Sequence, residues 1–102
     1  MAGVRWTPQA AEDLEAIANY IAVDSTHYAK LFTVDMLSVV ERLSDFPLSG
    51  RSVPECNDPA IREILFGSYR IVYRVKSDMV ELLTVYQGSR LLDPSRLTDN
   101  EG

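Results

Sequence analysis

Residues 61–86, IREILFGSYRIVYRVKSDMVELLTVY, decide the fold class of this chain. Three runs in this stretch are rich in Ile, Val, Leu and Tyr, the residue types that favour β-strands. Only Gly67-Ser68 and Lys76-Ser77-Asp78 separate the runs, and links this short are typical of hairpins. The stretch therefore predicts three consecutive antiparallel strands over 61–66, 69–75 and 79–86.

Two helices are predicted before the strands. Thr7-Pro8 is typical of a helix start, with Thr as the N-cap and Pro at the first helical position, and the apolar period of 3.6 then continues to about residue 23. Asp24-Ser25-Thr26 supplies a turn and a second N-cap, and helical periodicity resumes until Phe46, just before Pro47. The sequence thus predicts a helical hairpin over about 8–46.

The remaining segments complete an α+β fold. Three of the five prolines fall within 47–59, which is expected to be an irregular loop. Residues 4–6 are β-prone and could add a short N-terminal edge strand, whereas 91–102 are polar and are expected to form a frayed tail. We therefore expect one domain over 1–102, with the helical hairpin packed on one face of a small antiparallel sheet.

Composition excludes several classes of protein. Apolar residues make up 46% of the 102 residues and charged residues 25%, which is the balance of a globular domain and not of a disordered chain. One Cys and one His cannot form a disulfide and do not suggest a zinc site, and there is no nucleotide-binding motif, so no metal and no cofactor is expected. No signal peptide or membrane span is recognised, and a cytoplasmic location is expected.

The cations are unevenly placed. The net charge of −5 argues against non-specific nucleic-acid binding, but six of the ten Lys and Arg residues lie between Arg51 and Arg90. Strand alternation puts Arg70 and Arg74 on the same face of the sheet. This face could be solvated and balanced by nearby acids, or it could be a surface for anions or nucleic acid. The acids available for the first interpretation are Glu55, Glu63 and Glu81.

Helix two carries more apolar residues than one seam requires. Leu31, Leu37 and Val39 lie outside the stripe that begins at Ala29 and ends at Leu43. They could extend the core or contact a partner.

Catalytic residue types are scarce. His27 lies at the start of helix two and Cys56 in the proline-rich loop, so a nucleophile–base pair between them is disfavoured. Glu12, Asp13 and Glu15 are better explained by the favourable position of acids near a helix N-terminus than by a catalytic carboxylate pair.

An ordered set of short motifs across residues 4–92 resembles the ParE/RelE toxin superfamily. The motifs are Trp6-Thr7-Pro8, Ala11-Glu12-Asp13-Leu14, Tyr20-Ile21, Phe46-Pro47, Gly50-Arg51, Val53-Pro54-Glu55, Ile61-Arg62-Glu63, GSYRIVYR at 67–74, and Gly88-Ser89-Arg90. The resemblance implies the toxin of a type II toxin–antitoxin pair, with the helical hairpin and sheet derived above.

The superfamily includes two main activities. RelE-like members cleave mRNA on the ribosome with basic residues of the sheet, and Arg70 and Arg90 resemble two of their arginines. However, a basic pair would be expected around residues 61–63, and Arg62 is the only cation there. The neighbouring Glu63 carries the opposite charge. The segment 91–102 also lacks the Tyr or His expected near the C-terminus. These departures disfavour an RNase, and no catalytic residue is assigned.

The motifs at 46–47 and 53–55 are closer to the ParE branch, which inhibits DNA gyrase by binding. Because Arg70 and Arg74 share a strand face, we expect Arg70, Arg74 and Arg90 to contribute to one exposed basic face, and we assign target binding to Arg62, Arg70, Arg74 and Arg90. Gln87 stands where many ParE-like chains have His, so toxicity could be weaker or directed at another target.

The expected partner is a cognate antitoxin that covers the helical hairpin through Leu31, Leu37 and Val39. Related toxins suggest that its other end is a ribbon-helix-helix dimer, so that operator DNA would be bound only through the antitoxin. Two alternative functions remain: a RelE-like endonuclease, or a toxin fold with a different target or decayed activity.

Overall fold

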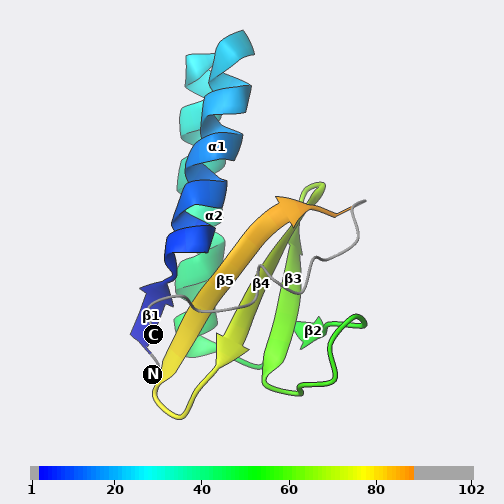
Figure 1. Ribbon diagram of the computed structural model, residues 1–102. Helices are drawn as coiled ribbons and strands as arrows, with labels where there is room; N and C mark the ends of the chain where they lie inside the picture. Colours follow the sequence, from blue (N-terminus) through cyan, green and yellow to red (C-terminus); the bar gives the residue numbers. More distant parts are fainter. Residues whose placement is uncertain (1–2, 89–102) are drawn as a thin grey trace.

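A computed structural model describes residues 3–88 and confirms the α+β fold (Figure 1). The polar tail expected at 91–102 lies outside the described residues. The elements in chain order are β1 (Gly3–Trp6), α1 (Pro8–Asp24), α2 (Thr26–Asp45), β2 (Arg51–Ser52), β3 (Ile61–Phe66), β4 (Tyr69–Val75) and β5 (Met79–Gln87).

The helix boundaries follow the capping residues. The Thr7 hydroxyl accepts a hydrogen bond from the Ala10 amide, and Pro8 occupies the first helical position of α1. The Ser25 hydroxyl accepts from the Tyr28 amide at 3.0 Å and caps α2 in the same way. Both helices therefore begin where local side-chain chemistry satisfies the first free amides.

The five strands form one sheet in the order β1-β5-β4-β3-β2. The three predicted hairpin strands β3, β4 and β5 are antiparallel, as expected. β1 is the predicted edge strand; it pairs parallel to β5, so the five-stranded sheet is mixed. β1 runs into the helical hairpin, and the chain returns through three antiparallel strands, which brings β5 back beside β1 in the same direction. β2 was not predicted, because a strand of two residues is too short to show an alternation of apolar and polar side chains.

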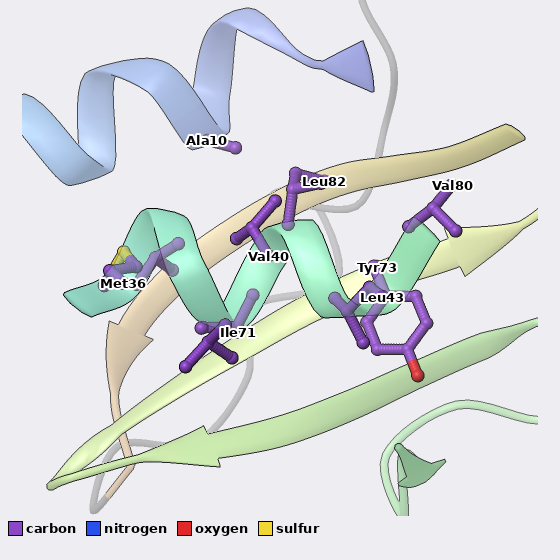
Figure 2. Close-up of a cluster of buried hydrophobic side chains, with 10 residues drawn as sticks. Ala10, Met36, Val40, Leu43, Ile71, Tyr73, Val80 and Leu82 are labelled. Carbon is purple, nitrogen blue, oxygen red and sulfur yellow. The ribbon is translucent and has the colours of Figure 1, made fainter. Parts of the chain in front are cut away.

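The main core lies between the sheet and the helical hairpin (Figure 2). Apolar side chains of α2 pack on the inner positions of β4 and β5, and Ala10 of α1 closes the cluster. The residues labelled in Figure 2 are Ala10, Met36, Val40, Leu43, Ile71, Tyr73, Val80 and Leu82. Because these side chains come from both layers, neither layer can bury its apolar surface alone.

Asp13 joins α1 to the edge of β5. β1 pairs only with Met79–Leu82, so within residues 3–88 the later part of β5 has no strand neighbour on that side. There the Asp13 carboxylate accepts from the Thr84 hydroxyl at 2.5 Å and from the Val85 amide at 3.0 Å. This side chain replaces a strand partner at the free edge.

Candidate functional site

The sheet face opposite the helices is partly covered and is not an open basic surface. Residues of the loop between β2 and β3 pack on it and form a second apolar cluster with β3, β4 and β5. The cluster contains Val53, Ile61, Val72, Leu83 and Tyr86, and Cys56 packs against it. The loop predicted from its prolines therefore acts as a cover for the sheet.

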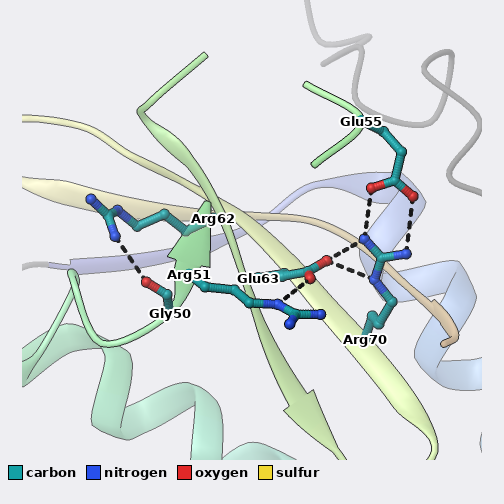
Figure 3. Close-up of polar contacts among 6 residues, drawn as sticks. All are labelled: Gly50, Arg51, Glu55, Arg62, Glu63 and Arg70. Atoms are coloured by element: carbon teal, nitrogen blue, oxygen red, sulfur yellow. Dashed lines mark hydrogen bonds and ion pairs between the residues drawn. The ribbon is translucent and has the colours of Figure 1, made fainter. Parts of the chain in front are cut away.

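Glu63 is the centre of an ionic network on this face (Figure 3). Its side chain is 0% exposed, and its two oxygens accept from different arginines. Arg51 Nε donates at 2.7 Å and Arg70 Nε at 2.6 Å. A buried carboxylate needs such charged donors to compensate for lost hydration.

Glu55 completes the network from the covering loop. Its carboxylate accepts from both terminal nitrogens of Arg70, at 3.1 and 3.0 Å, in the bidentate arrangement of a guanidinium fork. The Arg70 guanidinium also lies 5.0 Å from the centre of the Tyr86 ring. The hydrogen bond to Glu55 raises the pKa of Arg70 above its ordinary value, against the lowering effect of burial.

A second buried glutamate neutralises the other arginine of β4. Glu81 is 1% exposed and lies 2.5 Å from Arg5, 3.3 Å from Lys76 and 3.6 Å from Arg74. Arg74 is paired across the sheet with Glu81, so strand register brings these charges together.

The exposed basic face expected for Arg70, Arg74 and Arg90 is not seen in the described residues. Arg70 is only 7% exposed, so its expected exposure is wrong, because the loop and two carboxylates cover it. Arg74 is half-buried beside Glu81. Arg62 is paired across the sheet with Tyr73, a residue of the helix-facing core, so its side chain lies on the helix-facing side and not on the side of Arg70 and Arg74. There it donates to the Gly50 carbonyl at 2.8 Å. Arg90 lies outside the described residues.

The surplus apolar residues of α2 divide into two groups. Leu31 and Leu37 are exposed, as a partner surface requires. Val39 is 9% exposed and belongs to the main core, so its expected place on that surface is wrong. Leu31 also borders a cavity of about 510 Å³ beside Phe32, Phe66 and Tyr69.

A hollow beside the ionic network has a volume of about 710 Å³. Arg51, Glu55 and Arg70 contribute charged side chains to its wall, and Leu65 and Pro54 contribute apolar surface. Gly67, Ser68, Gln87 and Gly88 complete the described lining. The hollow is open to solvent, and the side chains of Arg51 and Arg70 form part of its wall.

The described residues offer little catalytic chemistry. His27 is exposed in the first turn of α2, at the tip of the hairpin, and Cys56 lies in the loop over the sheet. Burial raises the pKa of the Cys56 thiol, which disfavours the reactive thiolate. Within residues 3–88 no group of His, Cys, Asp or Glu is arranged to hold a metal ion. No helix in this range is long and apolar enough to cross a membrane.

The sequence identified Glu55, Glu63 and Glu81 as acids that could balance the arginines, but it did not predict which arginine each one contacts. The positions of Glu63 and Glu81 follow from strand pairing, because Glu63 faces Val72 and Glu81 faces Arg74 across the sheet, whereas Glu55 is placed by the covering loop. The roles of Arg51 and Tyr86 were missed. Arg51 reaches Glu63 only because the short strand β2 pairs with β3, and no local pattern predicts that contact.

Comparisons with known proteins agree on one family. The profile of the "ParE toxin of type II toxin-antitoxin system, parDE" matches residues 4–92. A protein of Sinorhizobium fredii (strain NBRC 101917 / NGR234) with the printed name "Putative toxin Y4kP" is 33% identical over 84 residues, which are 80% of this chain and 83% of that protein.

Two solved structures share the fold. One, described as the chromosomal ParDE TA system from P. aeruginosa, superposes with a TM-score of 0.71 at 24% identity, over 85% of this chain and 96% of that chain. The other, the toxin-antitoxin complex RelBE2 from Mycobacterium tuberculosis, has a TM-score of 0.56 at 24% identity, over 84% and 90% of the two chains.

Proposed function

This chain belongs to the ParE family of type II toxin–antitoxin toxins, and from that premise we propose that it inhibits DNA gyrase by binding and not by hydrolysis. The observation that supports this proposal over mRNA cleavage is the position of Arg70 between two carboxylates. A gyrase inhibitor acts in the cytoplasm, where its target is.

The alternative activity, ribosome-dependent mRNA cleavage, makes two chemical demands. A base must accept the proton of the attacking 2′-OH, and cations must stabilise the phosphorane. Both oxygens of Glu63 already accept from arginines, and His27 lies at the far tip of the hairpin. Arg70, the arginine of β4 that resembles a RelE residue, is itself neutralised by Glu55 and Glu63. In the resting network of residues 3–88, Glu63 is therefore not free to act as the base, and the charge of Arg70 is already neutralised.

Expression of the toxin in cells separates the two activities. A gyrase inhibitor should induce the SOS response and cause DNA breaks, and the purified chain should inhibit supercoiling by purified gyrase. Rapid translational arrest with cleaved mRNA and intact DNA would instead establish the endonuclease. Neither effect, from a folded protein, would leave the third alternative, a toxin fold with another target or decayed activity.

Target binding is assigned, as a proposal, to Arg62, Arg70, Arg74 and Arg90. Arg74 is the most informative variant, because it is half-buried and its pair with Glu81 is long, at 3.6 Å. Arg74→Ala should weaken gyrase inhibition with little effect on folding. Arg42→Ala, which removes an exposed arginine of α2, is the matched control and should inhibit like the wild type.

We further propose that a cognate antitoxin neutralises this toxin by covering the helical hairpin. The two superposed structures come from toxin–antitoxin systems. Leu31 and Leu37 expose apolar surface that a partner segment could bury, and Leu31 adds the adjoining aromatic cavity. A ribbon-helix-helix region of the antitoxin, and not this acidic chain, would then contact operator DNA.

Copurification with the product of an adjacent reading frame tests the antitoxin proposal. Leu37→Asp should weaken the complex, because it places a charge in an apolar interface. Leu48→Asp is the control, since Leu48 is an equally apolar exposed residue that lies after the end of α2. If both variants bind the antitoxin like the wild type, the hairpin surface around Leu37 is not its site.

A further inference from the structure

The two carboxylates that bind Arg70 are held very differently. Glu63 extends from β3, is paired with Val72 across the ladder and has a side chain that is 0% exposed. Glu55 extends from the covering loop and is 25% exposed. Its bonds to Arg70, at 3.0 and 3.1 Å, are longer than the bond of 2.6 Å between Arg70 and Glu63. Glu63 is thus the fixed inner ligand and Glu55 the outer one.

Only the outer ligand borders the hollow. Glu55, Arg70 and Arg51 all line the cavity of about 710 Å³, whereas Glu63 does not. Both terminal nitrogens of Arg70 donate to Glu55, and one of them also contacts Glu63, so Glu55 is the one carboxylate on the Arg70 fork that also lines the hollow (Figure 3). An incoming anion would meet Glu55 first.

The net charge of the network changes when Glu55 is removed. Arg51, Arg70, Glu55 and Glu63 together are neutral, so the resting network has no excess charge to attract an anion. Without Glu55 the remaining three side chains carry one net positive charge around a fork that Glu63 and the Tyr86 ring already orient. A guanidinium fork accepts phosphate in the same bidentate geometry as carboxylate.

We propose that the Arg70 fork is a phosphate site and that the Glu55 carboxylate is its built-in, exchangeable occupant. A small phosphate ester enters the hollow, replaces Glu55 on the two terminal nitrogens of Arg70 and takes Arg51 as a second cation. Leu65 and Pro54 give its organic part an apolar wall. Binding alone supplies no base, so this site does not make the chain a nuclease. Its test does not depend on gyrase, although Arg70 is also one of the residues proposed to contact that target.

Titration of isotope-labelled protein with inorganic phosphate, followed by the Nε–H signal of Arg70, tests the proposal. Glu55→Gln keeps the shape of the side chain and removes its charge, so phosphate should bind at least about tenfold more tightly than to the wild type. In the wild type the Cys56 amide of the covering loop should shift together with Arg70 as Glu55 is displaced. Glu55→Asp, which keeps the charge and shortens its reach, should bind with intermediate affinity.

Glu41→Gln is the matched control, since it makes the same change in net charge on the exposed surface of α2. Arg51→Ala in the Glu55→Gln background should reverse most of the gain. A nucleoside monophosphate as a second probe distinguishes a site for phosphate esters, which it should fill more tightly, from one for free phosphate. If Glu55→Gln and Glu41→Gln bind phosphate equally, or if the Arg70 signal does not move on binding, the proposed site is wrong.

Discussion

At the scale of single residues, Glu63 has the greatest effect on the second face of the sheet. Its buried carboxylate binds Arg51 with one oxygen and Arg70 with the other, and so joins β2, β3 and β4. The desolvation of this charge is compensated only while both arginines are present. Glu55, the outer carboxylate, has no comparable burial.

Glu63→Gln should therefore lower the free energy of unfolding by about 3 kcal/mol, because it removes the buried charge that both Arg51 and Arg70 bind and leaves the buried Arg70 with Glu55 alone. Glu55→Gln should cost at most about 1 kcal/mol, since its carboxylate is partly solvated. Urea denaturation of both variants measures the difference. Equal costs for the two substitutions would contradict the division into inner and outer carboxylates.

Tyr86 makes stability depend on pH at the alkaline end. Burial raises the pKa of Tyr86 to about 12, from an ordinary value of 10. The unfolded chain loses this proton first, so the contribution is fully present below about pH 10 and is lost as the pH rises to about 12. Tyr86→Phe should lose less stability across this window than the wild type. It should cost little at neutral pH, because the buried hydroxyl has no hydrogen-bond partner within residues 3–88.

Denaturation midpoints measured across the alkaline range test this prediction. Tyr20→Phe is the control, because Tyr20 is exposed on α1 and should keep the wild-type pH dependence. An identical alkaline profile for wild type and Tyr86→Phe would show that Tyr86 does not cause the loss.

At the scale of elements, polar side chains determine how α1 and the proline-rich loop attach to the sheet. Asp13 fixes α1 at the free edge of β5, and the Tyr73 hydroxyl fixes the loop after α2. That hydroxyl accepts from the Gly50 amide and donates to the Pro47 carbonyl, both at 2.8 Å. Apolar packing alone is non-directional and would not fix the position of α1 or of the loop along the sheet.

Asp13→Asn should destabilise the protein by about 1–3 kcal/mol, because the amide has one acceptor oxygen where the carboxylate uses two. Gln9 donates to one Asp13 oxygen, while Thr84 and Val85 donate to the other. Hydrogen exchange at the Val85 amide should become faster than in Glu12→Gln, a control on the exposed side of α1. Unchanged exchange would mean that Asp13 does not protect the edge of β5.

The destabilisation caused by Gly50→Ala should differ in size and in cause from that caused by Gly67→Ala. A Cβ at Gly50 would lie 2.5 Å from the Tyr73 hydroxyl oxygen and 2.6 Å from the Glu63 carbonyl oxygen, so the loop must move off the sheet. Gly67 has a φ of 59° but open space, so Ala there should cost only about 1 kcal/mol of backbone strain. Thermal unfolding should rank Gly50→Ala well below Gly67→Ala, and the reverse order would exclude a close contact at Gly50.

At the scale of the whole molecule, the pairing of cations with buried acids suppresses a basic surface. The net charge is −5, and the buried carboxylates Glu63 and Glu81 each have cations beside them. Non-specific DNA binding requires several cations that are free to neutralise phosphates. The protein as a whole is therefore poorly suited to bind duplex DNA by itself.

The isolated chain should show no measurable change in fluorescence anisotropy with labelled operator DNA at physiological salt. The complex with the antitoxin should bind, because the proposed ribbon-helix-helix region would supply the contacts. Salt-dependent binding by the toxin alone would contradict this expectation and would indicate a basic patch outside residues 3–88.

The sequence by itself determined the elements of this fold and its family. Strand composition at 61–86, the caps Thr7 and Ser25 and the helical period are local properties, so each can be recognised within one segment. The motifs across 4–92 likewise indicated the toxin superfamily, and the family profile agrees. The parallel pairing of β1 could not be recognised in this way, because its partner lies more than 70 residues away.

The candidate site was decided by the tertiary structure. Alternation along β4 correctly placed Arg70 and Arg74 on one face, but a strand pattern does not say what covers that face. Glu55 reaches Arg70 from a loop, Glu63 from the neighbouring strand, and Val39 is buried by packing on the sheet. Burial and ion pairing depend on contacts between segments distant in sequence, so residue type and spacing gave the charges, and only the folded chain determined which of them are free.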